Sequence, residues 1–135
     1  MRMLETFDTL GFSNFKRLID SIFPKKERRQ SRIIIAYIRI YTQLNNAFNL
    51  LSREECRRAF EYISFTKSII KQSEFDEEKV YLLRVEKILN SLLKKKEAII
   101  RSIKKENASD PSHVKTSVML AQNICILRIL KINKF

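Results

Sequence analysis

The residues whose types could do catalytic chemistry are few and form no motif. The one histidine, His113, has no second metal ligand at a suitable spacing, and a single glycine makes a glycine-rich phosphate loop impossible. Cys56 has no neighbouring group in the sequence that would activate its thiol. The acidic residues between positions 74 and 78 could bind a divalent cation, but they also suit the first turn of a helix, where the dipole favours carboxylates. We therefore predict a protein that is not an enzyme and needs no metal or cofactor.

The basic residues say more about function. Lysine and arginine together number 27 against 15 aspartates and glutamates, which gives a formal net charge of +12. Such a surplus raises the potential over the whole surface and favours polyanionic partners. The alternative is a compositional bias toward lysine, with the charge serving only as a solvated, soluble surface.

One group of cations crowds the start of a predicted helix: Lys25, Lys26, Arg28, Arg29 and Arg32. Cations at a helix N-terminus oppose the dipole and repel one another, so local stability gives no reason for them. On a helical wheel Lys25, Arg28, Arg32 and Arg39 lie nearly opposite the apolar seam of this helix. They would form a solvent-facing stripe.

A second stripe lies on a later helix, where Lys87, Lys94, Arg101 and Lys105 fall opposite the apolar seam. Two such stripes on adjacent helices could follow a phosphate backbone. The predicted contacts to DNA or RNA phosphates are Lys25, Arg28, Arg29, Arg32, Arg39, Lys87, Lys94, Arg101 and Lys105. No recognition helix, zinc finger or RNP motif is present, so we expect binding that is largely independent of sequence.

Two long amphipathic segments must position these stripes. Residues 26–51 repeat apolar side chains at alternating spacings of three and four, at Ile34, Tyr37, Tyr41, Leu44, Phe48 and Leu51. Residues 76–106 do the same at Leu82, Val85, Leu89, Leu92, Ile99 and Ile103, interrupted only by Lys96. The second segment predicts a single helix about 45 Å long that serves as the spine of the fold.

Shorter elements complete the expected fold. A short helix through residues 15–22 would end at Pro24, and Ser52 with Glu55 has the form of a capping box that begins a third helix. Asp110 and Pro111 would open the last helix, while residues 126–132 fit either helix or a short terminal strand. One glycine and two prolines disfavour an all-β fold. We predict one all-α domain over 1–135, a compact helical bundle of four to five helices with two long core helices packed antiparallel.

The cysteines and the hydrophobic runs bear on location. Cys56 and Cys125 both lie in apolar helical patterns, which predicts buried free thiols in a reducing compartment. No signal peptide opens the sequence, and Arg39 and Arg128 interrupt the two best candidates for a membrane span. We expect a cytoplasmic or nucleoid-associated protein with no membrane partner.

Several features suggest protein partners in a hetero-oligomer. The helix over 26–51 is apolar around more than half its circumference, and Lys96 interrupts an apolar seam. The basic and apolar stretch 128–135 is a candidate for docking on a partner or, alternatively, on an anionic membrane. A scaffold subunit with no nucleic-acid role is the alternative function.

Residues 77–103 resemble the core helix of GINS subunits, which belong to the replication complex that joins the replicative helicase in archaea and eukaryotes. The resemblance rests on Glu77 and Glu78 followed by Tyr81, Leu83, Val85, Ile88, Leu89, Leu92, Leu93, Ile99, Ile100 and Ile103. It implies a non-catalytic subunit of a DNA replication complex. The small β-rich second domain common in that family has no counterpart, because residues 109–135 look too short and too helical for it. The small helical subunits of CRISPR-type ribonucleoproteins are similar in size and charge.

Overall fold

The computed structural model describes residues 25–52, 55–104 and 112–133. Within these ranges the chain forms α3 (Lys25–Ser52), α4 (Cys56–Lys71), the 3-10 turn η2 (Asp76–Glu78), α5 (Lys79–Lys94), α6 (Lys96–Lys104) and α7 (Ser112–Ile132). No described residue lies in a strand, and residues 126–132 are helical. The prediction of an all-α helical bundle is confirmed. The expected short helix over 15–22 and the helix start at Asp110 and Pro111 lie outside the described residues.

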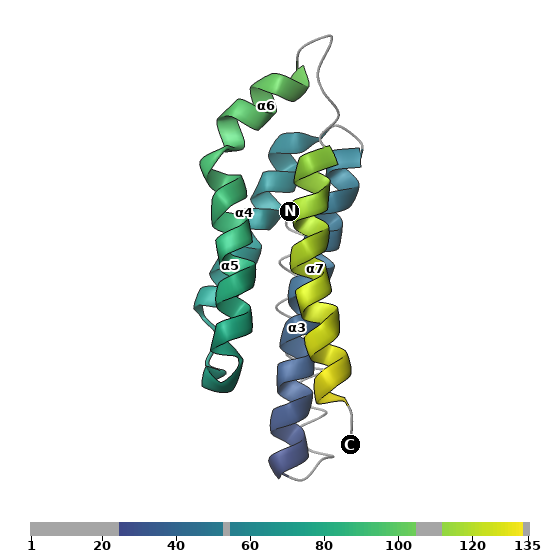
Figure 1. Cartoon of the computed structure of the whole chain (residues 1–135), viewed down its shortest axis with the longest axis vertical. Coiled ribbons are helices and arrows are strands. Elements are labelled where there is room, and N and C mark those ends of the chain that lie inside the picture. The colour runs from purple at the N-terminus through teal and green to yellow at the C-terminus, as the bar shows by residue number, and fades with distance from the viewer. Residues whose placement is uncertain (1–24, 53–54, 105–111, 134–135) are drawn as a thin grey trace.

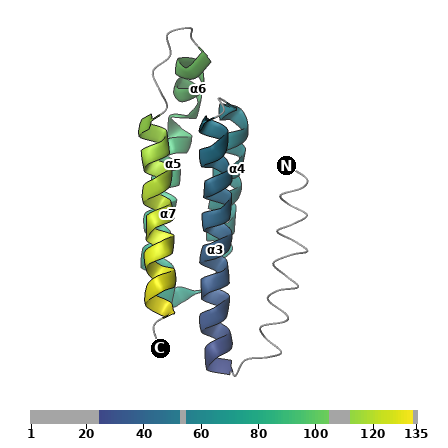
Figure 2. The same cartoon turned by 90° about the vertical axis from the view of Figure 1, so that its right-hand side faces the viewer.

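The four longest helices run alternately up and down along one bundle axis (Figure 1). α3 packs against α4 and α7, and α5 packs against the same two helices. Figure 2 shows α3 beside α7, with α4 and α5 forming the layer behind them. α3 and α5 are therefore diagonal across the bundle and run in the same direction. The expected antiparallel pairing of the two long segments is wrong, because α3 and α5 each pack against α4 and α7 and not against each other.

α3 contributes the longest buried stripe. Its core side chains recur at spacings of four and three, at Ile33, Tyr37, Ile40, Leu44, Ala47 and Leu51. The expected seam at Ile34, Tyr41 and Phe48 is half-buried, so the core-facing direction is rotated by part of a turn from the prediction. Of the isoleucines outside this stripe, Ile35 is buried, whereas Ile38 stays 40% exposed.

The expected single spine over 76–106 is three pieces instead. Asp76–Glu78 form a 3-10 turn, α5 ends at Lys94, and α6 starts at Lys96 after a break at Lys95. The backbone N–H of Lys95 donates to the carbonyl of Leu92 at 3.1 Å, a tight turn that ends the α-helical ladder. Beyond the break α6 leans away from the α5 axis and packs on α4, burying Ile99 and Ile100 (Figure 1). The buried stripe predicted for α5 is confirmed at Leu82, Val85, Leu89 and Leu92.

The predicted capping box at Ser52 and Glu55 is wrong. Ser52 is the last residue of α3, and α4 begins at Cys56 with Glu55 as an N-cap whose side chain makes no capping hydrogen bond. The carboxylate of Glu55 instead accepts a hydrogen bond from Arg58 at 3.0 Å. The connection is so short that the Glu55 N–H donates back to the carbonyl of Leu50 at 2.9 Å.

α7 differs from the other helices because it is apolar on its outer side as well as its inner side. Val114, Val118, Ala121 and Cys125 are fully buried in the core. Met119, Leu120, Ile126, Leu127 and Leu130 are exposed hydrophobic residues on the same helix. Among the described helices, none is both long and apolar enough to cross a membrane.

Candidate nucleic-acid interface

The break between α5 and α6 gathers lysines at one end of the bundle. Lys94 ends α5, Lys95 occupies the break with φ −97° and ψ 5°, and Lys96 begins α6. Lys94 and Lys95 are exposed, and Lys96 is half-buried. A helix C-terminus favours a nearby cation through its dipole, but three consecutive lysines also repel one another. Helix stability alone does not require all three of them.

The nearest acidic residue on α6 does little to neutralise this group. The Oε2 of Glu97 lies 3.9 Å from Nη2 of Arg57 on α4, and both side chains are more than half exposed. A pair this open and this long contributes little energy. Arg101, which is exposed, donates from Nε to the Glu97 backbone carbonyl at 3.3 Å. With the residues that the structure describes, none of Lys94, Lys95 and Lys96 forms an ion pair, so this end of the bundle keeps a positive surface.

The basic group at the start of α3 is engaged in the fold. Arg29 makes a two-pronged pair with Glu77 of η2, with Nε to Oε2 and Nη2 to Oε1 both at 2.7 Å. Its guanidinium also lies 5.5 Å from the centroid of the Phe75 ring. The hydrogen bond from Arg29 lowers the pKa of the Glu77 carboxyl below its usual value. Arg29 therefore joins α3 to the start of α5, and the expectation that this group serves no folding purpose is wrong for it.

The remaining candidates on α3 are less accessible than expected. Arg28, Arg32 and Arg39 are half-buried, and each takes part in an interaction within the chain. Lys25 is the first residue of α3, and its side chain lies outside the described part of the structure. On the second stripe Lys87 and Lys94 are exposed on α5, whereas Lys105 lies outside the described residues.

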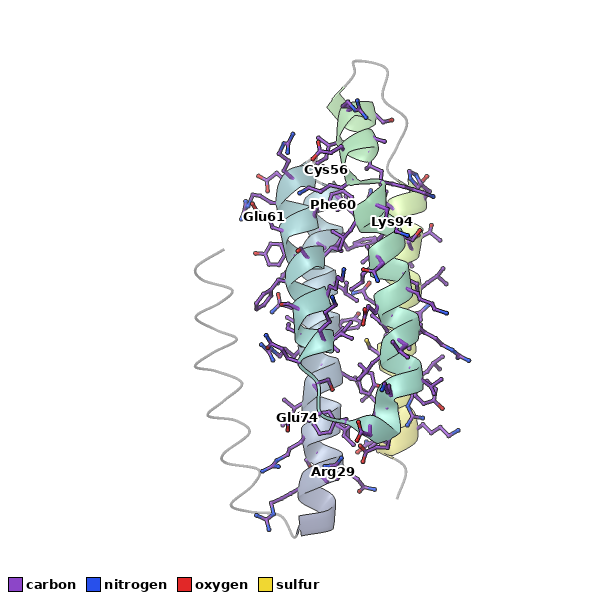
Figure 3. The ribbon with its side chains drawn as sticks, turned by 90° about the vertical axis from the view of Figure 1, so that its left-hand side faces the viewer. Arg29, Cys56, Phe60, Glu61, Glu74 and Lys94 are labelled. Atoms are coloured by element: carbon purple, nitrogen blue, oxygen red, sulfur yellow. The ribbon has the colours of Figure 1, made fainter. Side chains whose placement is uncertain are left out.

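The two predicted stripes do not form one surface. Because α3 and α5 are diagonal, the sides of these helices that face away from the core point in opposite directions. Figure 3 shows Arg29 near the lower end of the bundle and Lys94 near the upper end. The expectation of two stripes on adjacent helices is therefore wrong. The lysines at the α5–α6 break, with Arg101, form the candidate interface that the fold does bring together.

A buried polar cluster lies between α3, η2 and α7. Glu78, only 3% exposed, accepts hydrogen bonds from Nε and Nη2 of Arg128 at 2.8 Å each. Tyr37 donates its hydroxyl to Oε1 of the same carboxylate at 2.7 Å. The Arg128 guanidinium also lies 4.0 Å from the centroid of the Tyr81 ring. Burial, together with the hydrogen bond to Glu78, raises the pKa of Tyr37 well above its usual value.

This cluster adds to two sequence-based interpretations. Glu78 lies at the N-cap of α5, as the first-turn interpretation expects, but its carboxylate also pairs with Arg128. Arg128 points into the bundle, so its side chain is not an exposed part of the expected docking stretch over 128–135. The available signal was a single arginine inside the otherwise apolar run 124–130, because a charge in such a run needs a buried partner. The sequence does not identify that partner, which lies 50 residues away.

The two thiols are structural. Cys56 and Cys125 are both free and buried, as predicted. Desolvation raises the pKa of Cys125 to about 12 and also raises the pKa of Cys56. A thiol with a raised pKa is a poor nucleophile because so little thiolate is present near neutral pH. His113 is exposed near the start of α7, and among the described residues no group of three His, Cys, Asp or Glu side chains could hold a metal ion.

A shallow groove of about 310 Å³ lies where α4 ends and α5 begins. It is lined by Ile70, Phe75 and Leu82 together with the oppositely charged Lys71, Asp76, Lys79 and Glu86. Two cationic and two anionic side chains line it, so the groove favours neither an anionic nor a cationic ligand.

Comparisons with protein-family models, with curated proteins and with solved structures find no match for this chain.

Proposed function

We propose that this chain is a non-catalytic basic subunit that binds the phosphate backbone of DNA or RNA through the lysines at the α5–α6 break. The observation that carries the proposal is the exposure of Lys94, Lys95 and Arg101 at one end of the bundle, where the one carboxylate on α6 is held only loosely by Arg57. Phosphate contacts of this kind supply affinity without sequence specificity.

A non-catalytic role is supported by the state of the reactive groups. The carboxylate of Glu78, the guanidinium of Arg128 and the hydroxyl of Tyr37 satisfy one another inside the bundle. The buried thiols have raised pKa values, which disfavours a nucleophilic role. The resemblance of residues 77–103 to GINS core helices adds a role in a DNA replication complex to this proposal. The helix break at Lys95 falls inside the resembling region.

The test measures binding to labelled single-stranded and double-stranded oligonucleotides by fluorescence anisotropy over a range of salt concentrations. In the test variant Lys94, Lys95 and Arg101 are changed to Glu. In the matched control Lys67, Lys71 and Lys79 are changed to Glu, which alters the net charge equally on another part of the surface. Circular dichroism verifies that both variants fold.

We expect the test variant to bind at least about tenfold more weakly than the control at low salt. For duplex DNA, the slope of log affinity against log salt should fall by about 0.9 for each phosphate that the variant no longer neutralises. Equal reductions in the two variants would mean that only the overall charge matters and would reject the proposed interface. Comparing DNA with RNA oligonucleotides then shows which of the two nucleic acids the protein binds more tightly.

A scaffold role without nucleic acid is the second candidate, and the exposed apolar side of α7 favours it. It predicts no anisotropy change with any oligonucleotide.

A further inference from the structure

The outer side of α7 carries an apolar stripe, interrupted at its centre by the exposed Asn123. Met119, Leu120, Ile126, Leu127 and Leu130 are between 37% and 65% exposed, and they recur at the spacings that place residues on one side of a helix. The stripe is about 17 Å long, or three helical turns. Their side chains lie opposite Val118, Ala121 and Cys125, which are fully buried in the core. The stripe therefore adds nothing to the packing of the bundle.

The charged residues of α7 itself and the arginine at its boundary with α5 are all basic. α7 contains no aspartate or glutamate, and Lys131 is exposed in its last turn. On the neighbouring helix α5, Arg84 is exposed and lies 5.9 Å from the centroid of Tyr81, the ring that contacts Arg128 of α7. Arg84 therefore lies at the boundary between α5 and α7. An apolar stripe with a basic border complements a helix with an apolar stripe and an acidic border.

From this complementarity we propose that the outer side of α7 is a docking surface for an acidic amphipathic helix of a partner protein. An arrangement of this kind buries anchors at positions i, i+3, i+4 and i+7 of the partner helix. Its acidic borders would face Arg84 and Lys131. A second copy of this chain fits the surface poorly, because each copy carries a net charge of +12 and two such bodies repel one another. The proposal does not depend on nucleic-acid binding, because the lysines at the α5–α6 break lie at a different place in the bundle.

The test uses the full chain and a panel of fluorescent helical peptides with a leucine stripe bordered by glutamates. The control panel has the same stripes bordered by lysines. The test variant of the protein carries two substitutions on the stripe together, Leu127→Gln and Leu130→Gln. The matched control is Leu83→Gln, an exposed leucine on α5 that lines the groove beside α4. All three residues are exposed, so the variants should fold, which circular dichroism verifies.

We expect peptides bordered by glutamates to bind, and the paired substitution at Leu127 and Leu130 to weaken that binding at least about tenfold, because central apolar anchors dominate such interfaces. Leu83→Gln should leave binding unchanged. The Lys94, Lys95 and Arg101 variant should still bind the peptides, and the paired α7 variant should still bind oligonucleotides, so the two proposals can fail separately.

Four results would overturn this proposal. One is that no peptide bordered by glutamates binds better than its lysine counterpart, and another is that the α7 substitutions leave peptide binding unchanged. The third is concentration-dependent self-association in analytical ultracentrifugation that the α7 substitutions abolish, which would make a second copy the occupant. The last is co-sedimentation with phosphatidylglycerol vesicles that the same substitutions abolish, which would make the stripe a membrane-binding surface.

Discussion

Arg128 and Glu78 form a two-pronged ion pair inside the bundle, with both hydrogen bonds 2.8 Å long and the two side chains only 14% and 4% exposed. The pair joins the last described helix to the 3-10 turn that precedes α5. Tyr37 on α3 donates a third hydrogen bond to the same carboxylate. One buried charge thus links three segments that are distant in the sequence.

The first prediction concerns this pair. Arg128→Met should lower the free energy of unfolding by about 3–5 kcal/mol, because it leaves the Glu78 carboxylate buried without its cation. The double variant Glu78→Met with Arg128→Met should lose much less than the sum of the two single losses, since it removes both charges together. Urea denaturation at neutral pH measures all three values. A loss below about 1 kcal/mol for Arg128→Met would mean that water reaches the carboxylate.

The second prediction follows from the lowered pKa of Glu77. A carboxylate whose pKa is lower in the folded state stabilises the fold above its unfolded pKa of about 4.3, and this stabilisation is lost as the pH falls through the folded value. Arg29→Gln should therefore lower Tm at neutral pH and have little effect in strong acid, where Glu77 is protonated. Thermal unfolding monitored by circular dichroism at both pH values tests this.

Salt provides a second check on the pair of Arg29 and Glu77. Both side chains are about half exposed, so added salt should shrink the effect of Arg29→Gln at neutral pH. An effect of Arg29→Gln that stayed the same from neutral pH to strong acid would show that the substitution acts through the contact with Phe75 instead.

The third prediction concerns alkaline pH. Cys125 and Tyr37 both have raised pKa values, so the folded state keeps protons that the unfolded chain releases. Their contribution to stability is complete below the unfolded pKa values of about 8.5 for Cys and 10 for Tyr, and it is lost as the pH rises above them. Between about pH 9 and pH 10, Cys125 should make the free energy of unfolding fall by about 1.4 kcal/mol per pH unit.

A variant that lacks the Cys125 thiol isolates this effect. Cys125→Ala should reduce the pH slope in that range, although it also lowers stability at every pH by leaving a small cavity. Cys56→Ala is the control, and it should change the slope less because the pKa of Cys56 is shifted less. Denaturant titrations at several pH values give the slopes. Identical slopes for the wild type and Cys125→Ala would contradict the assignment.

The fourth prediction concerns Gln43 on α3. Its side chain is fully buried, and neither Nε2 nor Oε1 has a hydrogen-bond partner within the described structure. Gln43→Leu should raise the free energy of unfolding by about 1–3 kcal/mol, because it removes a buried polar group that the fold does not satisfy. Gln122→Leu, where only Nε2 lacks a partner, should give a smaller gain. Destabilisation by Gln43→Leu would indicate a buried water bound to the amide.

The local periodicity of the sequence was sufficient to predict α3, the buried stripe of α5 and the burial of both cysteines. These features depend on which side chains share one side of a helix, and the spacing of apolar residues determines this. The break at Lys95 could not be located, although Lys96 was recognised as an interruption of the seam. A lysine in a seam can be accommodated by a partner, by a long side chain reaching water, or by a bend, and the choice depends on tertiary packing.

The candidate interface was predicted only in part. Lys94 and Arg101 were predicted as phosphate contacts, whereas Lys95 and Lys96 were not, and the ion pair of Arg29 with Glu77 was not predicted. The pairings of Arg29 and Arg128 depend on which helices are diagonal in the bundle. Hydrophobic periodicity gives the direction of the core for each helix but does not give its neighbours.

The contact between α3 and α7 joins the first and the last described helices, so the ribosome completes one partner long before the other. Until α7 emerges, a nascent chain that ends at α6 would present an open apolar trough between α3 and α5, with Glu78 lacking its counter-charge. The bundle can close only after α7 has been synthesised. Chaperone dependence during translation is therefore expected to be greatest just before α7 leaves the ribosome.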